Sequence, residues 1–304
     1  MTSLRGWRRG LDQVAADRVR EIVGDALLTD GVAPMSGHLL DTLGSTDSHY
    51  LLADVADRIV AVAVRHDQDP AELVVHPAAR RRGIGRAMLA AVLELNPRVW
   101  AHGDLEAARG LAASTGMWPV RTLLQMRRSL PARIDAGTGL PQGFRIRSFV
   151  PGQDEEQFLV VNARAFSWHP EQGRLDGAGL AVEMAQDWFD PAGFFLAVDR
   201  DDRIWGFHWT KIHPVDPTPQ AGDELATAVR VPGPVGEVYV LGVDPESPVR
   251  GLGTPLTLAG LDHLSARGVR TVMLYVEGDN DRASALYRRL GFSTVITDRV
   301  YSGS

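Results

Sequence analysis

An internal repeat is the sequence feature that most constrains the fold of this chain. Its first copy lies near residues 75–85 and its second near residues 243–253, at one offset of 168 residues, as from Pro77 to Pro245. The positions that recur without a gap are Val75, Pro77, Arg82, Gly83 and Gly85, which return as Val243, Pro245, Arg250, Gly251 and Gly253. Self-similarity at a fixed offset is typical of repeated structural units, and 304 residues suffice for two domains of ordinary size. We therefore expect two homologous halves.

The spacing of apolar residues predicts the same order of elements in both halves. In the first half we expect helices over 12–28, 86–95 and 105–114, and strands over 50–54, 58–65, 72–75, 99–102 and 120–126. In the second half we expect helices over 154–165, 255–267 and 282–290, strands over 144–147, 194–198, 204–212, 237–243 and 271–276, and a strand-like tail. This is an α/β fold of the mixed-sheet α+β kind, in two tandem domains over 1–130 and 144–304. The aperiodic Pro-, Gly- and Thr-containing segment 131–143 is the expected linker, and residues 214–234 look like an insertion.

Composition excludes several classes of function. There is no cysteine, which removes disulfides, thiolate metal sites and cysteine nucleophiles, and we expect no metal. The net charge of −6 and the lack of a basic stripe argue against nucleic acid, and no apolar run is long enough to span a membrane. We expect a cytoplasmic monomer that acts on a small-molecule amine or thiol. The only lysine, Lys211, stands among 31 arginines, either by chance or because a compact ammonium is needed there.

Each half places a Gly-x-Gly between a predicted strand and a predicted helix, over 83–85 and 251–253. Glycines there let the backbone approach an anion, and the free N–H groups at the helix start can bind phosphate. The pattern lacks the Gly-Lys-Ser/Thr of a Walker loop and the third glycine of a dinucleotide fingerprint. By itself it could be a tight turn. In the second half, however, a further element follows over 275–292, and it includes Asp279-Asn280, Ala285-Leu286-Tyr287 and Leu290-Gly291-Phe292.

Together these residues resemble the GNAT-type N-acetyltransferase superfamily. Arg80-x-x-Gly83-x-Gly85 matches its Arg/Gln-x-x-Gly-x-Gly/Ala signature, and the downstream element matches its following helix. The resemblance covers nearly the whole chain, twice, and implies acetyl-CoA as co-substrate. The cofactor residues that it implies are Leu241, Gly242, Val243, Val249, Arg250, Gly251, Leu252, Gly253, Thr254 and Asn280 in the second half, and Leu73, Val74, Val75, Arg80, Arg81, Arg82, Gly83, Ile84, Gly85 and Arg86 in the first. Pro248 departs from the signature, because the family has Gln or Arg there.

The second half is similar, more narrowly, to tandem members that acetylate the cysteinyl amine of a cysteine–glucosamine–inositol conjugate. The match lies in residues 166–173, 208–211, 236–245, 274–277 and 286–287. It implies Glu237 as general base, Tyr287 as general acid and the backbone N–H of Leu241 as oxyanion donor. The substrate contacts that it implies are Glu171, Lys211, Glu237 and Tyr275.

The residue types suit this chemistry. Amide formation from a thioester needs a neutral amine, a stabilised carbonyl oxygen and a protonated leaving thiolate. A carboxylate at Glu237 can take the amine proton through water, and two-residue alternation places Glu237, Tyr239 and Leu241 on one face. We expect a bulge at Leu241-Gly242. A phenol can donate to a departing thiolate. Asn280 could simply be a helix N-cap, although the resemblance also implies that its side chain lies near the cofactor.

The first half lacks these groups. Alignment of the two halves places Ala112 where Tyr287 stands and Asp69, in a turn, opposite Glu237, while Glu72 is out of register. We expect this half to bind acetyl-CoA and to catalyse poorly, either as a structural unit or as part of the substrate site. Two alternatives remain open for the whole chain. It could acetylate another amine, such as a protein N-terminus or an aminoglycoside, or it could be a non-catalytic acyl-CoA sensor.

Overall fold

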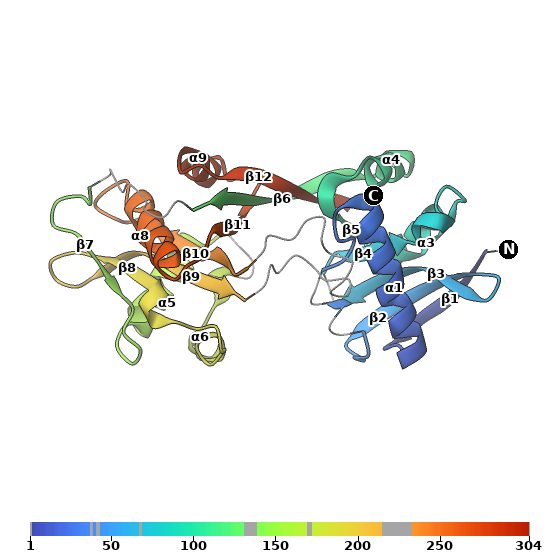
Figure 1. Ribbon diagram of the computed structural model, residues 1–304, viewed down its shortest axis with the longest axis horizontal. Helices are drawn as coiled ribbons and strands as arrows, with labels where there is room; N and C mark the ends of the chain where they lie inside the picture. The colour runs from blue at the N-terminus through green and yellow to red at the C-terminus, as the bar shows by residue number, and fades with distance from the viewer. Residues whose placement is uncertain are drawn as a thin grey trace.

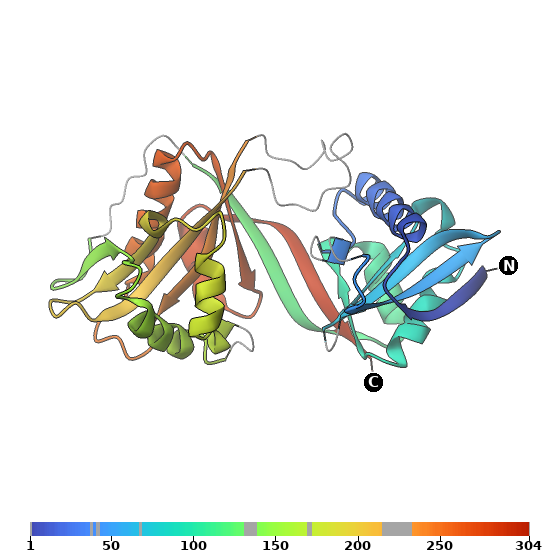
Figure 2. The same ribbon diagram turned by 90° about the horizontal axis from the view of Figure 1, so that it is seen from below.

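The molecule is built on one continuous sheet of 12 strands, divided between two lobes (Figure 1). The computed structural model describes residues 2–36, 39–40, 43–66, 69–130, 139–168, 172–214 and 233–303. Two long strands, β6 and β12, run side by side from one lobe to the other (Figure 2). In the described ranges, no helix is both long and apolar enough to cross a membrane.

The first lobe contains a helix on each face of its strands. The first half of the chain, which supplies this lobe except for an exchanged strand, contains β1 (Thr2–Arg9), α1 (Gln13–Asp30), β2 (Ser48–Val55), β3 (Arg58–His66), β4 (Ala71–Val75), α3 (Ile84–Leu93), β5 (Arg98–Ala101), α4 (Glu106–Ser114) and β6 (Trp118–Ser129). Helix α1 packs its buried residues with Tyr50 and Leu52 of β2. Helix α3 packs Met88 and Leu89 with Leu51, which points to the opposite face of the same strand.

The second lobe repeats this plan. The second half of the chain contains β7 (Arg145–Ser148), α5 (Glu155–Ala165), α6 (Gly177–Met184), β8 (Phe194–Val198), β9 (Ile204–His213), β10 (Val235–Val243), α8 (Gly253–Ala266), β11 (Thr271–Glu277), α9 (Asp281–Arg289) and β12 (Ser293–Ser302). On one face, α5 places Phe158 among Phe194, Phe207 and Trp209, with ring centroids 4.8–6.4 Å from that of Phe158. On the other face, Leu261 and Leu264 of α8 pack with Val238 of β10.

The last strand of each half lies in the sheet of the other half. The strand order is β1-β2-β3-β4-β5-β12-β6-β11-β10-β9-β8-β7. Strand β12 pairs antiparallel with β5, and β6 pairs antiparallel with β11, while β6 and β12 pair with each other. The C-terminus consequently lies in the N-terminal lobe (Figure 1). Neither half completes its sheet without a strand from the other.

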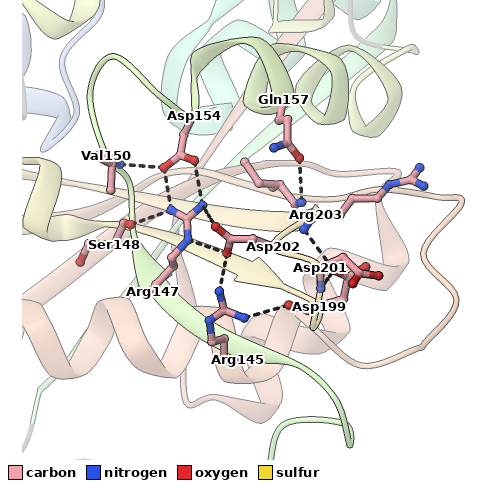
Figure 3. A network of polar contacts seen from close by, with 11 residues as sticks. Arg145, Arg147, Ser148, Val150, Asp154, Gln157, Asp199, Asp201, Asp202 and Arg203 are labelled. Atoms are coloured by element: carbon pink, nitrogen blue, oxygen red, sulfur yellow. Dashed lines mark hydrogen bonds and ion pairs between the residues drawn. The ribbon is translucent and has the colours of Figure 1, made fainter.

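A network of ion pairs holds the outer edge strand β7 to the turn between β8 and β9 (Figure 3). The Arg147 guanidinium donates to both oxygens of Asp154, at 2.6 and 2.8 Å, and to Asp202 at 3.0 Å. Arg145 donates to the same Asp202 carboxylate at 2.5 Å. Although burial acts to raise the pKa of Asp154, its bonds to Arg147 and to the Val150 N–H lower it. These bonds fix the edge of the second lobe at β7.

The predicted elements are confirmed, with ends within a few residues of those expected. Sequence periodicity missed β1 and α6, and it did not indicate the strand exchange. The bulge expected at Leu241-Gly242 is wrong. The register of β10 against β9 shifts between Val238 and Val240, which makes Tyr239 the extra residue.

The displaced bulge also changes which side chains share a face of β10. Tyr239 and Val240 both pack with the α5-side cluster, whereas Leu241 packs with the clusters under α8, as Val238 does. Glu237, which alternates with Val238, faces the same side as Tyr239. The expectation that Leu241 shares this face with Glu237 and Tyr239 is therefore wrong.

Candidate active site

Strands β10 and β11 separate immediately after Glu237. Their parallel ladder pairs Val235–Glu237 with Thr271–Met273, so that, among the described strands, the rest of β10 has no partner on the β11 side. This splay leaves the backbone at Leu241–Val243 open to a ligand along one edge. Glu237 is 8% exposed and stands at the point where the strands diverge.

Glu237 lies among polar groups supplied by the neighbouring strand β9. It pairs across the ladder with Lys211, and its Oε2 is 2.7 Å from Nε2 of His213. The Lys211 ammonium lies 4.2 Å from the ring centroid of Trp188 and 5.1 Å from that of Tyr239. The Tyr239 hydroxyl donates to Glu183 on α6. The aromatic rings thus hold the ammonium on the face of the sheet from which Glu237 points.

Strand β6 of the first half contributes directly to this face. Gln125 pairs with Tyr275, and its Nε2 donates to the Tyr275 hydroxyl at 2.9 Å. Gln125 is 3% exposed, whereas Tyr275 is 46% exposed. The exchanged strand therefore orients one of the expected substrate residues. Sequence reasoning missed His213, Trp188 and Gln125, because only the tertiary structure brings His213 to Glu237, Trp188 to Lys211 and Gln125 to Tyr275.

Tyr287 lies on α9 and packs in the α8-side core. It is 6% exposed and packs against Phe292, with ring centroids 5.7 Å apart. Burial raises the pKa of its phenol well above the ordinary value of 10, so the group keeps its proton at neutral pH. Within the described residues, no side chain hydrogen-bonds this hydroxyl. Asn280 caps the same helix by accepting from the Ala283 N–H at 3.0 Å.

The loop after β10 leads into a helix start that no side chain caps. Gly251 has φ +90°, and Leu252 precedes α8 without a side-chain hydrogen bond to its first turn. Free N–H groups at a helix N-terminus suit a phosphate. A cavity of about 230 Å³ adjoins this loop and is lined by Val243, Val249, Arg250, Gly251, Arg164 and Arg282, among others. The expected cofactor residues Leu241, Gly242, Leu252, Gly253, Thr254 and Asn280 do not line this cavity.

The first half has the larger cavity, of about 720 Å³. Its loop is built in the same way: Gly83 has φ +81°, and α3 starts without a side-chain cap. The expected cofactor residues that line the cavity are Leu73, Val74, Val75, Arg80, Arg81, Gly83, Gly85 and Arg86. Ile84 is instead buried in the core at 2% exposure, and Arg82 is absent from the lining. The Arg80 guanidinium forms two 2.7 Å bonds to Asp30, which hold it at the wall.

A buried charge cluster stands at the splay of the first half. Glu72 is the last residue of the β4–β5 ladder, and Glu237 is the last residue of the β10–β11 ladder. Glu72 is, however, three residues nearer in sequence to the Gly-x-Gly of its half than Glu237 is to that of the second half. His102 lies 3.5 Å from Glu72 and 3.5 Å from Asp298 of the exchanged strand β12. Burial acts to lower the pKa of His102, but the bonds and ion pairs with Asp298 and Glu72 raise it to about 10. The negative charge of Glu72 is therefore balanced by the His102 imidazolium, which makes Glu72 poorly suited to act as a general base.

Comparison with known proteins agrees with this geometry. Residues 161–292 match the acetyltransferase (GNAT) family, and residues 46–114 match an acetyltransferase (GNAT) domain. A mycothiol acetyltransferase of Saccharomonospora viridis is 45% identical over 97% of both chains. One of Mycolicibacterium vanbaalenii is 46% identical over 97% of this chain and 96% of its own.

This chain belongs to the mycothiol acetyltransferase family of GNAT proteins. It is accordingly an acetyl-CoA-dependent N-acetyltransferase with two GNAT domains.

Solved structures of the superfamily share the tandem fold. A GCN5-related N-acetyltransferase from Sphaerobacter thermophilus superposes with a TM-score of 0.68 at 22% identity, over 99% of this chain and 95% of that one. A tandem GNAT protein from the clavulanic acid biosynthesis pathway gives 0.64 at 16% identity, over 100% and 98%. At these identities the likeness extends to the fold alone.

The other expected residues divide into two groups. Lys211, Glu237 and Tyr275 come together on one face of the sheet, whereas Tyr287 lies on the opposite face, beyond the splay. Glu171 and most of the expected insertion, residues 215–232, lie outside the described residues, as do linker residues 131–138. In the described part of the chain, no cluster of His, Cys, Asp or Glu could hold a metal ion.

Proposed function

We propose that the protein transfers an acetyl group from acetyl-CoA to the cysteinyl amine of a cysteine–glucosamine–inositol conjugate, the last step of mycothiol biosynthesis. The observation that carries the proposal is the placement of Glu237 at the β10–β11 splay, beside Lys211 and Tyr275. The names of the relatives that match 97% of the chain support the choice of acceptor.

In this proposal Glu237 is the general base. Its carboxylate takes a proton from the cysteinyl ammonium through water, which leaves a nucleophilic amine. The backbone N–H at Leu241 donates to the carbonyl oxygen as negative charge develops there. Tyr287 gives its phenol proton to the departing thiolate, and the raised pKa of Tyr287 keeps that proton in place until transfer.

The coenzyme would be held by the backbone of β10 and by the loop that follows. The open edge at Leu241–Val243 suits the amides of a pantetheine arm, and the uncapped start of α8 suits the pyrophosphate. When bound, acetyl-CoA supplies the activated acyl group. In the first half, the 720 Å³ cavity and the uncapped start of α3 support a second acetyl-CoA site.

The acceptor would lie on the Glu237 face. The Lys211 ammonium offers three donors to sugar or inositol hydroxyls, and the half-exposed Tyr275 offers a hydroxyl and a ring. We also assign Glu171 to this acceptor site. A polyhydroxylated substrate requires such paired donors and acceptors.

Mass spectrometry of reactions with acetyl-CoA tests the acceptor directly. The purified protein is incubated with the cysteinyl-glucosaminyl-inositol conjugate and, separately, with a peptide N-terminus and an aminoglycoside. We expect one acetyl group to be gained by the conjugate alone. Acetylation of another amine only would refute the acceptor assignment, and binding of acetyl-CoA without any product would indicate a sensor.

The Glu237→Gln variant tests the mechanism. Because the amide cannot accept the amine proton, kcat should fall about 100-fold or more. Acetyl-CoA affinity, measured by calorimetry, should stay the same, since Glu237 is not placed among the coenzyme contacts. Unchanged turnover would rule out Glu237 as the base.

A further inference from the structure

His213 is the ionisable side chain in closest contact with the proposed base, and neither the resemblance nor the comparisons assign it a role. Its Nε2 lies 2.7 Å from Oε2 of Glu237, with side chains only 16% and 11% exposed. The contact follows from strand register: Glu237 pairs with Lys211, and His213 lies two residues further along β9 on the same face. Diagonal neighbours of this kind are within reach for long side chains.

The contact fixes where one proton must lie. A carboxylate oxygen and an imidazole nitrogen at 2.7 Å repel each other unless a proton stands between them. With Glu237 ionised, as a base must be, the proton is on Nε2 of His213, which then donates to Oε2. The other oxygen, Oε1, remains available to the amine.

The other charged and ionisable groups described around the Glu237 carboxylate have partners of their own. Lys211 lies opposite Glu237, but its ammonium is held over Trp188 and Tyr239. The Tyr239 hydroxyl donates to Glu183, and the Tyr275 hydroxyl accepts from Gln125. Within the described residues, the hydrogen bond to the Glu237 carboxylate comes from His213.

We propose that His213 is a positioning residue for the acetyl transfer: its Nε2–H holds Oε2 of Glu237 and directs Oε1 towards the amine. The inference rests on the proposed function of Glu237. The proton balance of the reaction is unchanged, because the amine proton goes to Oε1 and His213 keeps its own. Loss of His213 should therefore leave the Glu237 carboxylate free to turn, so that Oε1 is less often directed at the amine.

Two substitutions separate positioning from packing. His213→Ala removes the donor, whereas His213→Gln places an amide N–H near the position of Nε2. We expect His213→Ala to lower kcat about tenfold or more, with the KM for acetyl-CoA unchanged, and His213→Gln to recover most of the loss.

A matched control comes from the same lobe. His263 on α8 lies 3.6 Å from Asp190, outside the proposed site, so His263→Ala removes another histidine–carboxylate pair. Turnover by this variant should equal that of the wild type. Wild-type turnover in His213→Ala would overturn the proposal. Equal loss in His213→Ala and His213→Gln would also overturn it, by showing a packing role.

A spectroscopic measurement tests the contact apart from turnover. Long-range ¹H–¹⁵N spectra of the full chain should show His213 protonated at Nε2, with that signal changed in Glu237→Gln. An imidazole protonated at Nδ1 alone would refute the contact. If the wild-type protein acetylated no amine, the proposed function would be wrong. If the wild-type protein acetylated the conjugate and His213→Ala did so at the same rate, only the role proposed for His213 would be wrong.

Discussion

At the residue scale, the two proposed proton-transfer groups are set apart by their surroundings. Glu237 has a hydrogen-bond partner in His213 and pairs across the ladder with Lys211 of β9. Tyr287 is enclosed by apolar side chains, and burial raises its pKa. One group is therefore suited to accept a proton and the other to retain one until the thiolate forms.

The Tyr287→Phe variant isolates the proton donor. Because no described side chain hydrogen-bonds the hydroxyl, phenylalanine keeps the packing against Phe292. We expect kcat to fall about 100-fold with little change in Tm or in acetyl-CoA affinity. Steady-state kinetics and thermal denaturation check this, and a variant with full turnover would remove Tyr287 from the mechanism.

At the element scale, each half presents the same strand, glycine loop and uncapped helix start. Gly251 and Gly83 have φ +90° and +81°, a backbone region that residues with a Cβ adopt only with strain. An added Cβ would meet no atom within 4 Å at either glycine. Substitution by alanine should therefore act through the backbone alone, at a cost of about 1–2 kcal/mol.

The two loops can be separated by these matched glycine substitutions. Gly251→Ala should weaken acetyl-CoA binding in the second half and raise the KM for acetyl-CoA several-fold. Gly83→Ala should weaken a second binding event, seen by calorimetry, and leave turnover near that of the wild type. If Gly83→Ala lowered turnover as much as Gly251→Ala, the first half would have to take part in catalysis.

At the scale of the whole molecule, the exchange of β6 and β12 makes each lobe depend on the other. Strand β12 supplies Asp298 to His102 in the first lobe, and β6 supplies Gln125 to Tyr275 in the second. Separation of the lobes would expose the edges of β5 and β11 to solvent. The two GNAT units are thus joined by their sheets as well as by a connecting segment.

We expect the two lobes to unfold together. Calorimetry should give one transition, with a calorimetric enthalpy close to the van't Hoff value. Asp298→Asn, on a strand of the second half, should lower the Tm of that single transition. Two resolved transitions, of which only one responds to the substitution, would contradict this coupling.

The His102 cluster also predicts how stability depends on pH. Its pKa is raised from 6.5 to about 10 in the folded protein, so the folded state binds the proton more tightly than the unfolded state does. The stabilisation is complete below pH 6.5 and is lost as pH rises to about 10. Between these values the Tm of the wild type should fall more steeply than that of His102→Gln. Parallel Tm profiles for the two proteins would show that His102 is not protonated in the folded state.

The sequence by itself determined the repeat, the order of helices and strands, and the candidate residues Glu237, Lys211, Tyr275 and Tyr287. These follow from local signals: apolar periodicity, glycines at fixed spacing and motif letters at a constant offset. Only the tertiary structure decided the strand exchange, the bulge at Tyr239 and the contact of His213 with Glu237. Each of these depends on hydrogen-bond register between strands, and a shift of one residue turns a side chain to the other face without changing the apolar pattern that predicts the strand.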